Sequence, residues 1–338
     1  DGLRDVRLGG GRHQEFLSTE GVTSPGTMTG GELGGAAIPG EATQPRHMLR
    51  GLLLSLRPDQ WTKNLVVFAG LLFGRKLMDA SAVMAALAAF TLFCGLSSAA
   101  YLINDVLDRV SDRRHPLKSR RPIAAGLIPL PVALGTAAGL FAVSLAGAAA
   151  LGGAFAGVAV GYGVLTCLYS LFLKHVVILD VLAIAVGFVI RAAAGALAVE
   201  VGISQWLFVC TILGALFISF AKRRHEIVLL GVEASSHRPI LGEYSTYLLD
   251  QLISITAGST LVAYMLYATS PETVAKFGTA RLDLTIPFPM YGIFRYLYLV
   301  HQRRGGGNPT DLLVSDPPLV GCIVLWAISV ALIIYGRP

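Results

Sequence analysis

Charged residues are scarce in this sequence, where they make up 14% of the 338 residues while hydrophobic residues make up 54%. An ordinary soluble domain carries about 25% charged residues, so the composition excludes that class. Apolar runs long enough to cross a bilayer, about 17–25 residues each, recur along the chain. The predicted fold class is therefore an all-α, polytopic membrane protein.

Cysteine is also rare, and the four cysteines lie inside apolar segments without forming a CxxC pair: Cys94, Cys167, Cys210 and Cys322. This pattern implies neither a disulfide framework nor a zinc site. The net charge is +6, but Lys and Arg accumulate in the cytoplasmic loops of membrane proteins. We therefore predict membrane lipids as surroundings and no nucleic-acid partner.

The chain divides into two parts. Residues 1–50 are rich in Gly, Ser, Thr and Pro and show no apolar period, which predicts a disordered N-terminal tail. Residues 51–338 are predicted to form one transmembrane domain. Its nine candidate spans lie at about 60–74, 80–103, 130–149, 152–173, 177–199, 204–221, 250–269, 286–300 and 318–336.

The distribution of basic residues predicts the orientation. With a cytoplasmic N-terminus, 19 of the 27 Lys and Arg residues fall in inside segments and five fall outside. This bias favours an N-terminus inside the cell. The two long polar loops, 104–129 and 222–249, then both face the cytoplasm, so we expect the active site on that side of the cell membrane.

One acidic stretch follows the second predicted span. Asn104, Asp108 and Asp112 are four residues apart and would share one face of a helix, with Asp105 beside them. Crowded carboxylates repel one another unless a cation joins them, and Mg²⁺ binds one or two carboxylates together with substrate phosphates. We predict these four residues as Mg²⁺ ligands and the three aspartates as catalytic.

Basic residues come next in the chain: Arg113, Arg114, Lys118, Arg120 and Arg121. An acidic ridge followed by a cationic loop is suited to holding a diphosphate, because Lys and Arg neutralise the oxygens that the metal leaves free. Lys118 and Arg121 are predicted to bind donor phosphates. For the other three, a role in setting membrane topology is an equal alternative.

The stretch "NDVLDRVSDRRHPLKSRRPIAAG" resembles the first aspartate-rich motif of the UbiA-type intramembrane prenyltransferase superfamily. The pattern NDxxDxxxD, followed by basic residues and RP, matches at Asn104, Asp105, Asp108, Asp112 and Arg121-Pro122. The resemblance covers roughly residues 50–338. It implies a bundle of about nine helices with a polar cavity that faces the cytoplasm.

The sequence departs from this superfamily at the loop after the sixth span. Typical members carry a second DxxxD motif there, whereas this chain has "AKRRHEIVLL" from Ala221. Together with "RPDQWTKNLVVFAGLLFG" and "DVLAIAVGFVIRAAAGA", this stretch resembles the decaprenyl-phosphate phosphoribosyltransferase branch. The resemblance implies 5-phosphoribosyl 1-diphosphate as donor and polyprenyl phosphate as acceptor. The product would feed synthesis of cell-wall arabinan, a part of arabinogalactan.

Further substrate-binding residues are predicted around this site. Tyr101 lies one turn before Asn104, where its hydroxyl can reach a sugar or a phosphate, and Arg191 is placed deep in a span, which favours the cavity over a buried ion pair. For Lys63, contact with a substrate and snorkelling of the side chain to the membrane interface are equal alternatives. The remaining predicted ligands are Lys174, Lys222, Arg223, Arg224 and Tyr244.

Two alternatives stay open. One is prenyl transfer from a polyprenyl diphosphate to an aromatic acceptor, against which the missing second DxxxD motif counts. The other is a lipid-phosphate carrier without catalysis, although a transporter is expected to place its polar site near the midplane. The lipid chain length and the oligomeric state, including a homo-oligomer, are also left open by the sequence.

Overall fold

The structure is a computed structural model that describes residues 45–115, 118–202, 204–231, 239–302, 312 and 315–336. These residues form helices and contain no strand, which confirms the all-α prediction. One compact unit comprises Ala42–Pro338. Helix α1 (Pro45–Ser55) includes residues 45–50, which were predicted to belong to the tail. The preceding part of the predicted tail lies outside the described residues.

Seven of the described helices are long and apolar enough to cross a membrane: α3 (Ala80–Leu107), α5 (Leu130–Ala150), α6 (Gly153–Leu171), α7 (Leu179–Ala198), α8 (Gln205–Leu230), α10 (Thr246–Thr269) and α14 (Pro317–Tyr335). They match seven of the nine predicted spans. The predicted first span is instead the 3₁₀ helix η2 (Pro58–Phe68) followed by the short α2 (Ala69–Phe73). The eighth is α12 (Pro287–Gln302), of 16 residues. The count of nine is therefore not confirmed.

Shorter elements connect these helices: α4 (Arg109–Arg114), η3 (Lys118–Arg120), η4 (Leu173–His175), η6 (Pro239–Glu243), α11 (Pro271–Phe277) and η7 (Arg281–Thr285). Several helices begin where the sequence supplies a cap. The Asp79 side chain accepts hydrogen bonds from the backbone N–H groups of Ser81 and Ala82 at the start of α3. The Ser81 hydroxyl also donates to this carboxylate, and this bond, followed by those from the Ala82 N–H and from Lys76, lowers the pKa of Asp79 to about 2.

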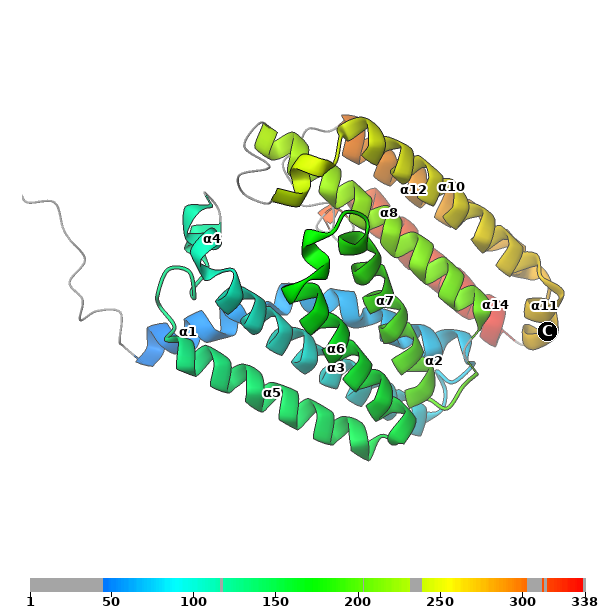
Figure 1. Ribbon diagram of the computed structural model, residues 1–338. Coiled ribbons are helices and arrows are strands. Elements are labelled where there is room, and N and C mark those ends of the chain that lie inside the picture. The colour runs from blue at the N-terminus through cyan, green and yellow to red at the C-terminus, as the bar shows by residue number, and fades with distance from the viewer. Residues whose placement is uncertain are drawn as a thin grey trace, which may run out of the picture. The chain divides into compact units, whose positions relative to one another are not determined.

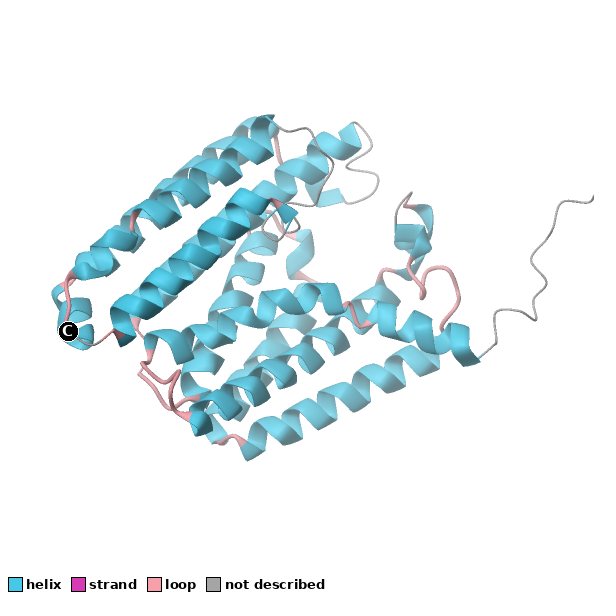
Figure 2. Cartoon of the chain, turned by 180° about the vertical axis from the view of Figure 1, so that it is seen from behind, coloured by secondary structure: helices cyan, strands magenta, loops and turns pink. Residues whose placement is uncertain are grey.

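Helix α7 joins two groups of helices (Figure 1). On one side it packs with η2, α3 and α6 around Phe93, Phe155 and other buried side chains. On the other it packs with α8, whose Phe217 and Phe220 meet buried residues of α10, α12 and α14. The view from behind shows the same division (Figure 2). Helix α7 is also the most buried of the seven candidate spans. The cavity described below is bounded by both groups.

Close backbone contact fixes α7 against the first hydrophobic segment. The chain has glycine at 195, and a methyl group there would overlap with the carbonyl oxygen of Val67. A methyl group at Gly70 would likewise lie 2.7 Å from the backbone nitrogen of Ala196. Glycine at both positions therefore lets η2 and α2 pack directly on α7, which positions one wall of the cavity.

Replacing Gly195 by alanine is expected to destabilise the protein by about 1–3 kcal/mol, because the added methyl group forces the two backbones apart. Thermal unfolding in detergent would measure this change. Gly258→Ala in α10 is the matched control, since a methyl group there would meet nothing within 4 Å. Equal unfolding temperatures for the two variants would contradict the view that close packing of η2 on α7 requires glycine at position 195.

Candidate active site

A cavity of about 1000 Å³ lies among η2, α3, α6, α7, α8 and α14. Ten of the fourteen predicted site residues line it: Lys63, Tyr101, Asn104, Asp108, Asp112, Lys118, Arg121, Lys174, Arg191 and Lys222. The other four do not line it: Asp105, Arg223, Arg224 and Tyr244. The fold thus collects residues from widely separated parts of the chain, as the resemblance implies.

The walls of the cavity carry an excess of positive charge. Seven lining residues are Lys or Arg and three are Asp or Glu, which leaves a formal excess of four positive charges. Apolar residues such as Val320, Ile323 and Val324 of α14 line another part of the same space. A cavity of this kind is suited to an anionic group attached to an apolar chain.

The acidic ridge lies where α3 meets α4. Helix α3 ends at Leu107, and Asp108 caps it, so the predicted continuous helix is interrupted at that residue. The backbone hydrogen bonds from Asp108 to Asn104 and from Asp112 to Asp108 are nevertheless kept, each at 2.8 Å. The Asn104 amide donates to Asp108 Oδ2 at 2.9 Å. The spacing of four therefore does bring Asn104 and Asp108 together.

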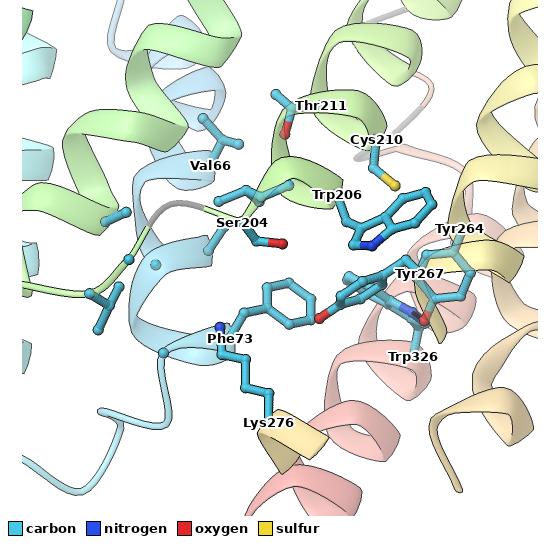
Figure 3. A pocket seen from close by; sticks show the side chains of 17 residues that line it. Val66, Phe73, Ser204, Trp206, Cys210, Thr211, Tyr264, Tyr267, Lys276 and Trp326 are labelled. Atoms are coloured by element: carbon cyan, nitrogen blue, oxygen red, sulfur yellow. Dashed lines mark hydrogen bonds between the residues drawn. The ribbon is translucent and has the colours of Figure 1, made fainter. Parts of the chain in front are cut away.

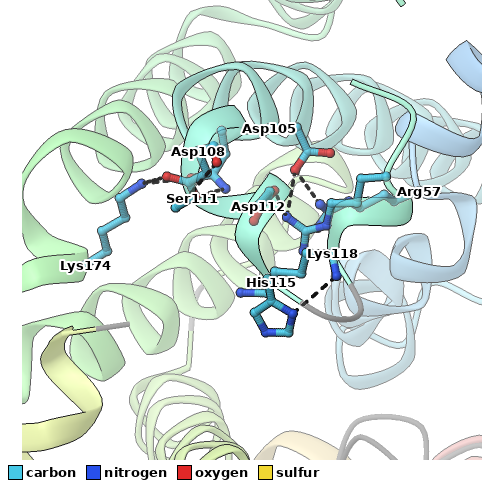
Figure 4. Close-up of polar contacts among 10 residues, drawn as sticks. Arg57, Asp105, Asp108, Ser111, Asp112, His115, Lys118 and Lys174 are labelled. Atoms are coloured by element: carbon cyan, nitrogen blue, oxygen red, sulfur yellow. Dashed lines mark hydrogen bonds and ion pairs between the residues drawn. The ribbon is translucent and has the colours of Figure 1, made fainter. Parts of the chain in front are cut away.

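Each aspartate of the ridge pairs with at least one cation, and Asp105 and Asp112 share Arg121. Lys174 Nζ lies 2.6 Å from Asp108 Oδ1. Arg121 Nη1 lies 2.6 Å from Asp112 Oδ2 and 3.2 Å from Asp105 Oδ1. Asp105 is only 2% exposed and is directed away from Asp108, toward Arg57 (Figure 4). Asn104, Asp108 and Asp112 therefore line the cavity, whereas the Asp105 carboxylate lies behind the cavity wall.

The cavity-lining part of the ridge fits a divalent cation. Asn104, Asp108 and Asp112 offer a carboxamide and two carboxylates, which are the hard oxygen ligands that Mg²⁺ prefers. No group of three or more His, Cys, Asp or Glu in the described part of the chain is close enough to hold a metal by itself. The donor set therefore fits an ion that has few protein ligands and completes its coordination with water and phosphate oxygens.

Arg191 lies deep in α7 and is only 6% exposed. Its guanidinium donates to Asn64 Oδ1 and to the Tyr162 hydroxyl, each at 2.7 Å, and to the Gly187 carbonyl at 3.0 Å. These partners are all neutral, and no carboxylate pairs with Arg191 in the described parts of the chain. A buried cation with neutral partners at a cavity wall is suited to receiving an anionic substrate group.

Of the three predicted ligands on α8, one lines the cavity and two form ion pairs elsewhere. Lys222 lines the cavity, whereas Arg223 is 2% exposed and binds Asp180 at 2.7 Å and Glu226 at 2.9 Å. Arg224 pairs with Asp250 near His301. The pairs with Asp180 and Asp250 connect α8 to α7 and α10, and neither Arg223 nor Arg224 lines the cavity. Arg295 of α12 likewise pairs with Asp316, next to the start of α14.

Tyr244 is buried beside the Arg223 ion pair. Its hydroxyl donates to Asp180 Oδ1 at 2.7 Å and accepts from the Ile178 backbone N–H at 2.7 Å. Burial, followed by the hydrogen bond to Asp180, raises the pKa of Tyr244 to about 12. The hydroxyl therefore stays protonated at neutral pH and holds Asp180 in place.

Comparison with known proteins identifies the family. Residues 64–309 match the UbiA prenyltransferase family. The chain belongs to this family. It is also 31% identical over 299 residues to a protein named decaprenyl-phosphate phosphoribosyltransferase from Corynebacterium glutamicum, covering 87% of this chain and 90% of that protein. A protein of the same name from Mycolicibacterium smegmatis is 32% identical over 307 residues, covering 87% of this chain and 95% of that protein.

Solved structures agree with the UbiA assignment at the level of fold. A UbiA homolog from Archaeoglobus fulgidus bound to GPP and Mg²⁺ superposes with a TM-score of 0.67 at 17% identity, covering 84% of this chain and 99% of that chain. Seven apolar helices and UbiA membership indicate a multi-pass membrane protein. The family and the named relatives also support transferase activity for this chain.

This UbiA family member has a second cavity, of about 230 Å³, whose lining residues are drawn in Figure 3. The two share Val66, Cys210 and Thr211 in their linings. The second cavity is mostly apolar and is enclosed by five aromatic side chains: Phe73, Trp206, Tyr264, Tyr267 and Trp326. The main cavity is therefore continued by an apolar space, on the side away from the acidic ridge.

Sequence reasoning missed several cavity residues. Glu226 lines the cavity on α8, four residues after Lys222, and the helical spacing alone could have identified it. Tyr162 and Ser97, which contact Arg191, resemble ordinary core residues in the sequence. Arg57 also lines the cavity. Its position just before η2 gives no periodic signal, although it is the first residue of the stretch "RPDQWTKNLVVFAGLLFG" that contributes to the resemblance.

Proposed function

We propose that this protein transfers 5-phosphoribose from 5-phosphoribosyl 1-diphosphate to a polyprenyl phosphate and releases diphosphate. The observation that carries the proposal is the distribution of charge in the main cavity. One acidic ridge is present where α3 meets α4, and Lys222 of α8 lines the wall where a second acidic motif is missing. The identity to proteins named decaprenyl-phosphate phosphoribosyltransferase supports the same reaction.

The chain's own residues have two tasks in this reaction. Lys118 and Arg121 neutralise charge on the diphosphate as the bond between it and ribose C1 breaks, an arrangement that stabilises the transition state. The lipid phosphate is already an anion, so it forms the new bond to C1 without a general base and needs only to be positioned. Lys222 and Arg191 are the proposed ligands for this acceptor phosphate.

A magnesium ion fits beside Asn104, Asp108 and Asp112 and, when bound, would add positive charge on the diphosphate leaving group. The UbiA homolog from Archaeoglobus fulgidus was solved with Mg²⁺. Lys174 and Arg121 pair with the carboxylates of Asp108 and Asp112. These two cations therefore lie close enough to the acidic ridge to contact a phosphate group held there.

The apolar parts of the site suit the lipid acceptor. The residues of α14 that line the main cavity and the aromatic side chains of the second cavity offer apolar surface for isoprene units. The Lys and Arg residues of the main cavity would then receive the phosphate. The excess of Lys and Arg in the loops at this end supports an orientation in which it faces the cytoplasm. A soluble phosphoribosyl donor would then reach the site from the cytoplasm.

Purified protein in detergent, supplied with decaprenyl phosphate, Mg²⁺ and donor labelled in the ribose, is expected to form a labelled lipid that contains phosphoribose. Thin-layer analysis of the organic extract would detect this product. A parallel reaction with geranyl diphosphate and 4-hydroxybenzoate tests prenyl transfer. A prenylated aromatic product without labelled lipid would replace the proposal, and the absence of both products would support a carrier.

A further inference from the structure

The chain contains two arginines that share one buried carboxylate oxygen. Arg57 Nη2 lies 2.5 Å from Asp105 Oδ1, and Arg121 Nη1 lies 3.2 Å from the same atom. Asp105 is 2% exposed and does not line the cavity, whereas both arginines do. The carboxylate therefore holds the two guanidinium groups together at the cavity wall. Figure 4 shows Asp105 directed toward Arg57.

Both guanidinium groups keep donors free for a ligand. A guanidinium has five N–H donors. In the described part of the chain, Arg57 donates only to Asp105, and Arg121 donates through Nη1 to Asp105 and Asp112. Their side chains are 23% and 26% exposed. Two fixed forks with unused donors match the several oxygens of one phosphate group.

The backbone of Arg57 is held in an unusual conformation. Its φ of 54° and ψ of 62° lie in the left-handed region, although it is not glycine and it precedes Pro58. Strained residues of this kind persist where the surroundings determine them, often at functional sites. Here the Asp105 ion pair and stacking of the guanidinium 5.0 Å from the centre of the Tyr101 ring determine the position.

We infer that Arg57 and Arg121 form a clamp for one phosphate group of the substrates, with Asp105 as the residue that positions both. This role for Asp105 differs from the metal ligand predicted from the sequence motif. The inference rests on the proposed function in that it assumes phosphorylated substrates. Because the proposed mechanism places Arg121 at the donor diphosphate, we expect the phosphate to be one of the phosphoribosyl donor. A polyprenyl phosphate shares the chemistry that the clamp recognises, and the kinetics distinguish the two sources.

Steady-state kinetics would test the clamp. Arg57→Ala is expected to raise the KM for one of the two substrates by about tenfold to a hundredfold, which is the effect of losing a charged hydrogen bond. The kcat is expected to change less than threefold. Varying the donor at saturating lipid, and the lipid at saturating donor, identifies the source of the phosphate. Unchanged KM values for both substrates would overturn the inference.

Arg75→Ala is the matched control. Arg75 is exposed and also has a positive φ, of 59°, but it does not line either cavity. The same change at Arg75 therefore removes an arginine from a left-handed position without touching the clamp. It is expected to leave both KM values unaltered. A rise in KM equal to that of Arg57→Ala would assign the effect to the backbone and would refute the clamp.

Asp105→Asn separates positioning from metal binding. If Asp105 only holds the arginines, this variant raises the same KM as Arg57→Ala, and combining the two changes adds little more. The Mg²⁺ concentration that gives half-maximal activity stays at its original value. A shift in that concentration without a shift in KM would make Asp105 a metal ligand and would contradict the inference.

A binding measurement keeps this test independent of turnover. Calorimetric titration of the purified protein with inorganic pyrophosphate, in the presence of a chelator, is expected to show weaker binding for Arg57→Ala and Asp105→Asn than for the original chain or Arg75→Ala. Equal affinities together with unaltered KM values would reject the clamp. Failure of the original chain to transfer phosphoribose would reject the proposed function, while the titration would still report on the clamp.

Discussion

Replacing Asp108 by asparagine is expected to reduce phosphoribosyl transfer by about a hundredfold or more, which is the loss typical when one preorganised charged group is removed from a transition state. Asp108 combines three properties: it lines the cavity, it is hydrogen-bonded to Asn104, and it is balanced by Lys174 at 2.6 Å. The substitution keeps the shape of the side chain and removes the charge that would hold the metal. Initial rates at saturating donor and lipid would measure the loss.

The metal dependence gives the second readout for this variant. If Asp108 holds Mg²⁺, raising the Mg²⁺ concentration is expected to restore part of the activity of Asp108→Asn. Asp283→Asn in η7 is the matched control, because Asp283 is exposed and lies outside both cavities. Full activity of Asp108→Asn in the presence of a chelator would contradict the assignment.

The pairing of Asn104 with Asp108 could be predicted because helical periodicity is a local rule. Residues four apart share a helix face, and the backbone hydrogen bonds keep this spacing even where α3 ends at Leu107. The long spans were predictable for a similar reason, since the thickness of the bilayer sets their length. The two predicted spans that the structure forms as shorter elements, η2 with α2 and α12, are those in which the apolar run is shortest.

The direction in which each charged side chain points could not be predicted, because it depends on partners far away in the sequence. Asp105 is adjacent to Asn104 in the motif, yet it faces Arg57, 48 residues earlier. Lys222 and Arg223 are neighbours on α8, and only the first lines the cavity. A motif identifies which residues carry charge, whereas the packing of helices decides which of them a substrate can reach.

Arg223→Met is expected to destabilise the protein by about 3–5 kcal/mol, because it leaves the carboxylate of Asp180 buried without its cation. Asp180 is 0% exposed and has Arg223 Nε at 2.7 Å. Methionine fills a similar volume with apolar atoms, so the cost comes from the loss of the Arg223–Asp180 ion pair and not from a cavity. Thermal unfolding in detergent, monitored by exposure of the buried cysteines to a thiol-reactive dye, would measure it.

The sequence predicted Arg223 as a substrate ligand, and the double variant distinguishes that role from the structural one. Adding Asp180→Asn to Arg223→Met removes the buried carboxylate charge while keeping an acceptor for the Tyr244 hydroxyl. If Arg223 is structural, the double variant is expected to recover a large part of the lost stability and to retain transfer activity. A single variant that unfolds at the original temperature but binds donor or lipid poorly would instead make Arg223 a ligand. Three consecutive basic residues on one helix need not form one binding surface, because successive side chains on a helix point about 100° apart. Lys222 accordingly lines the cavity, whereas Arg223 and Arg224 do not.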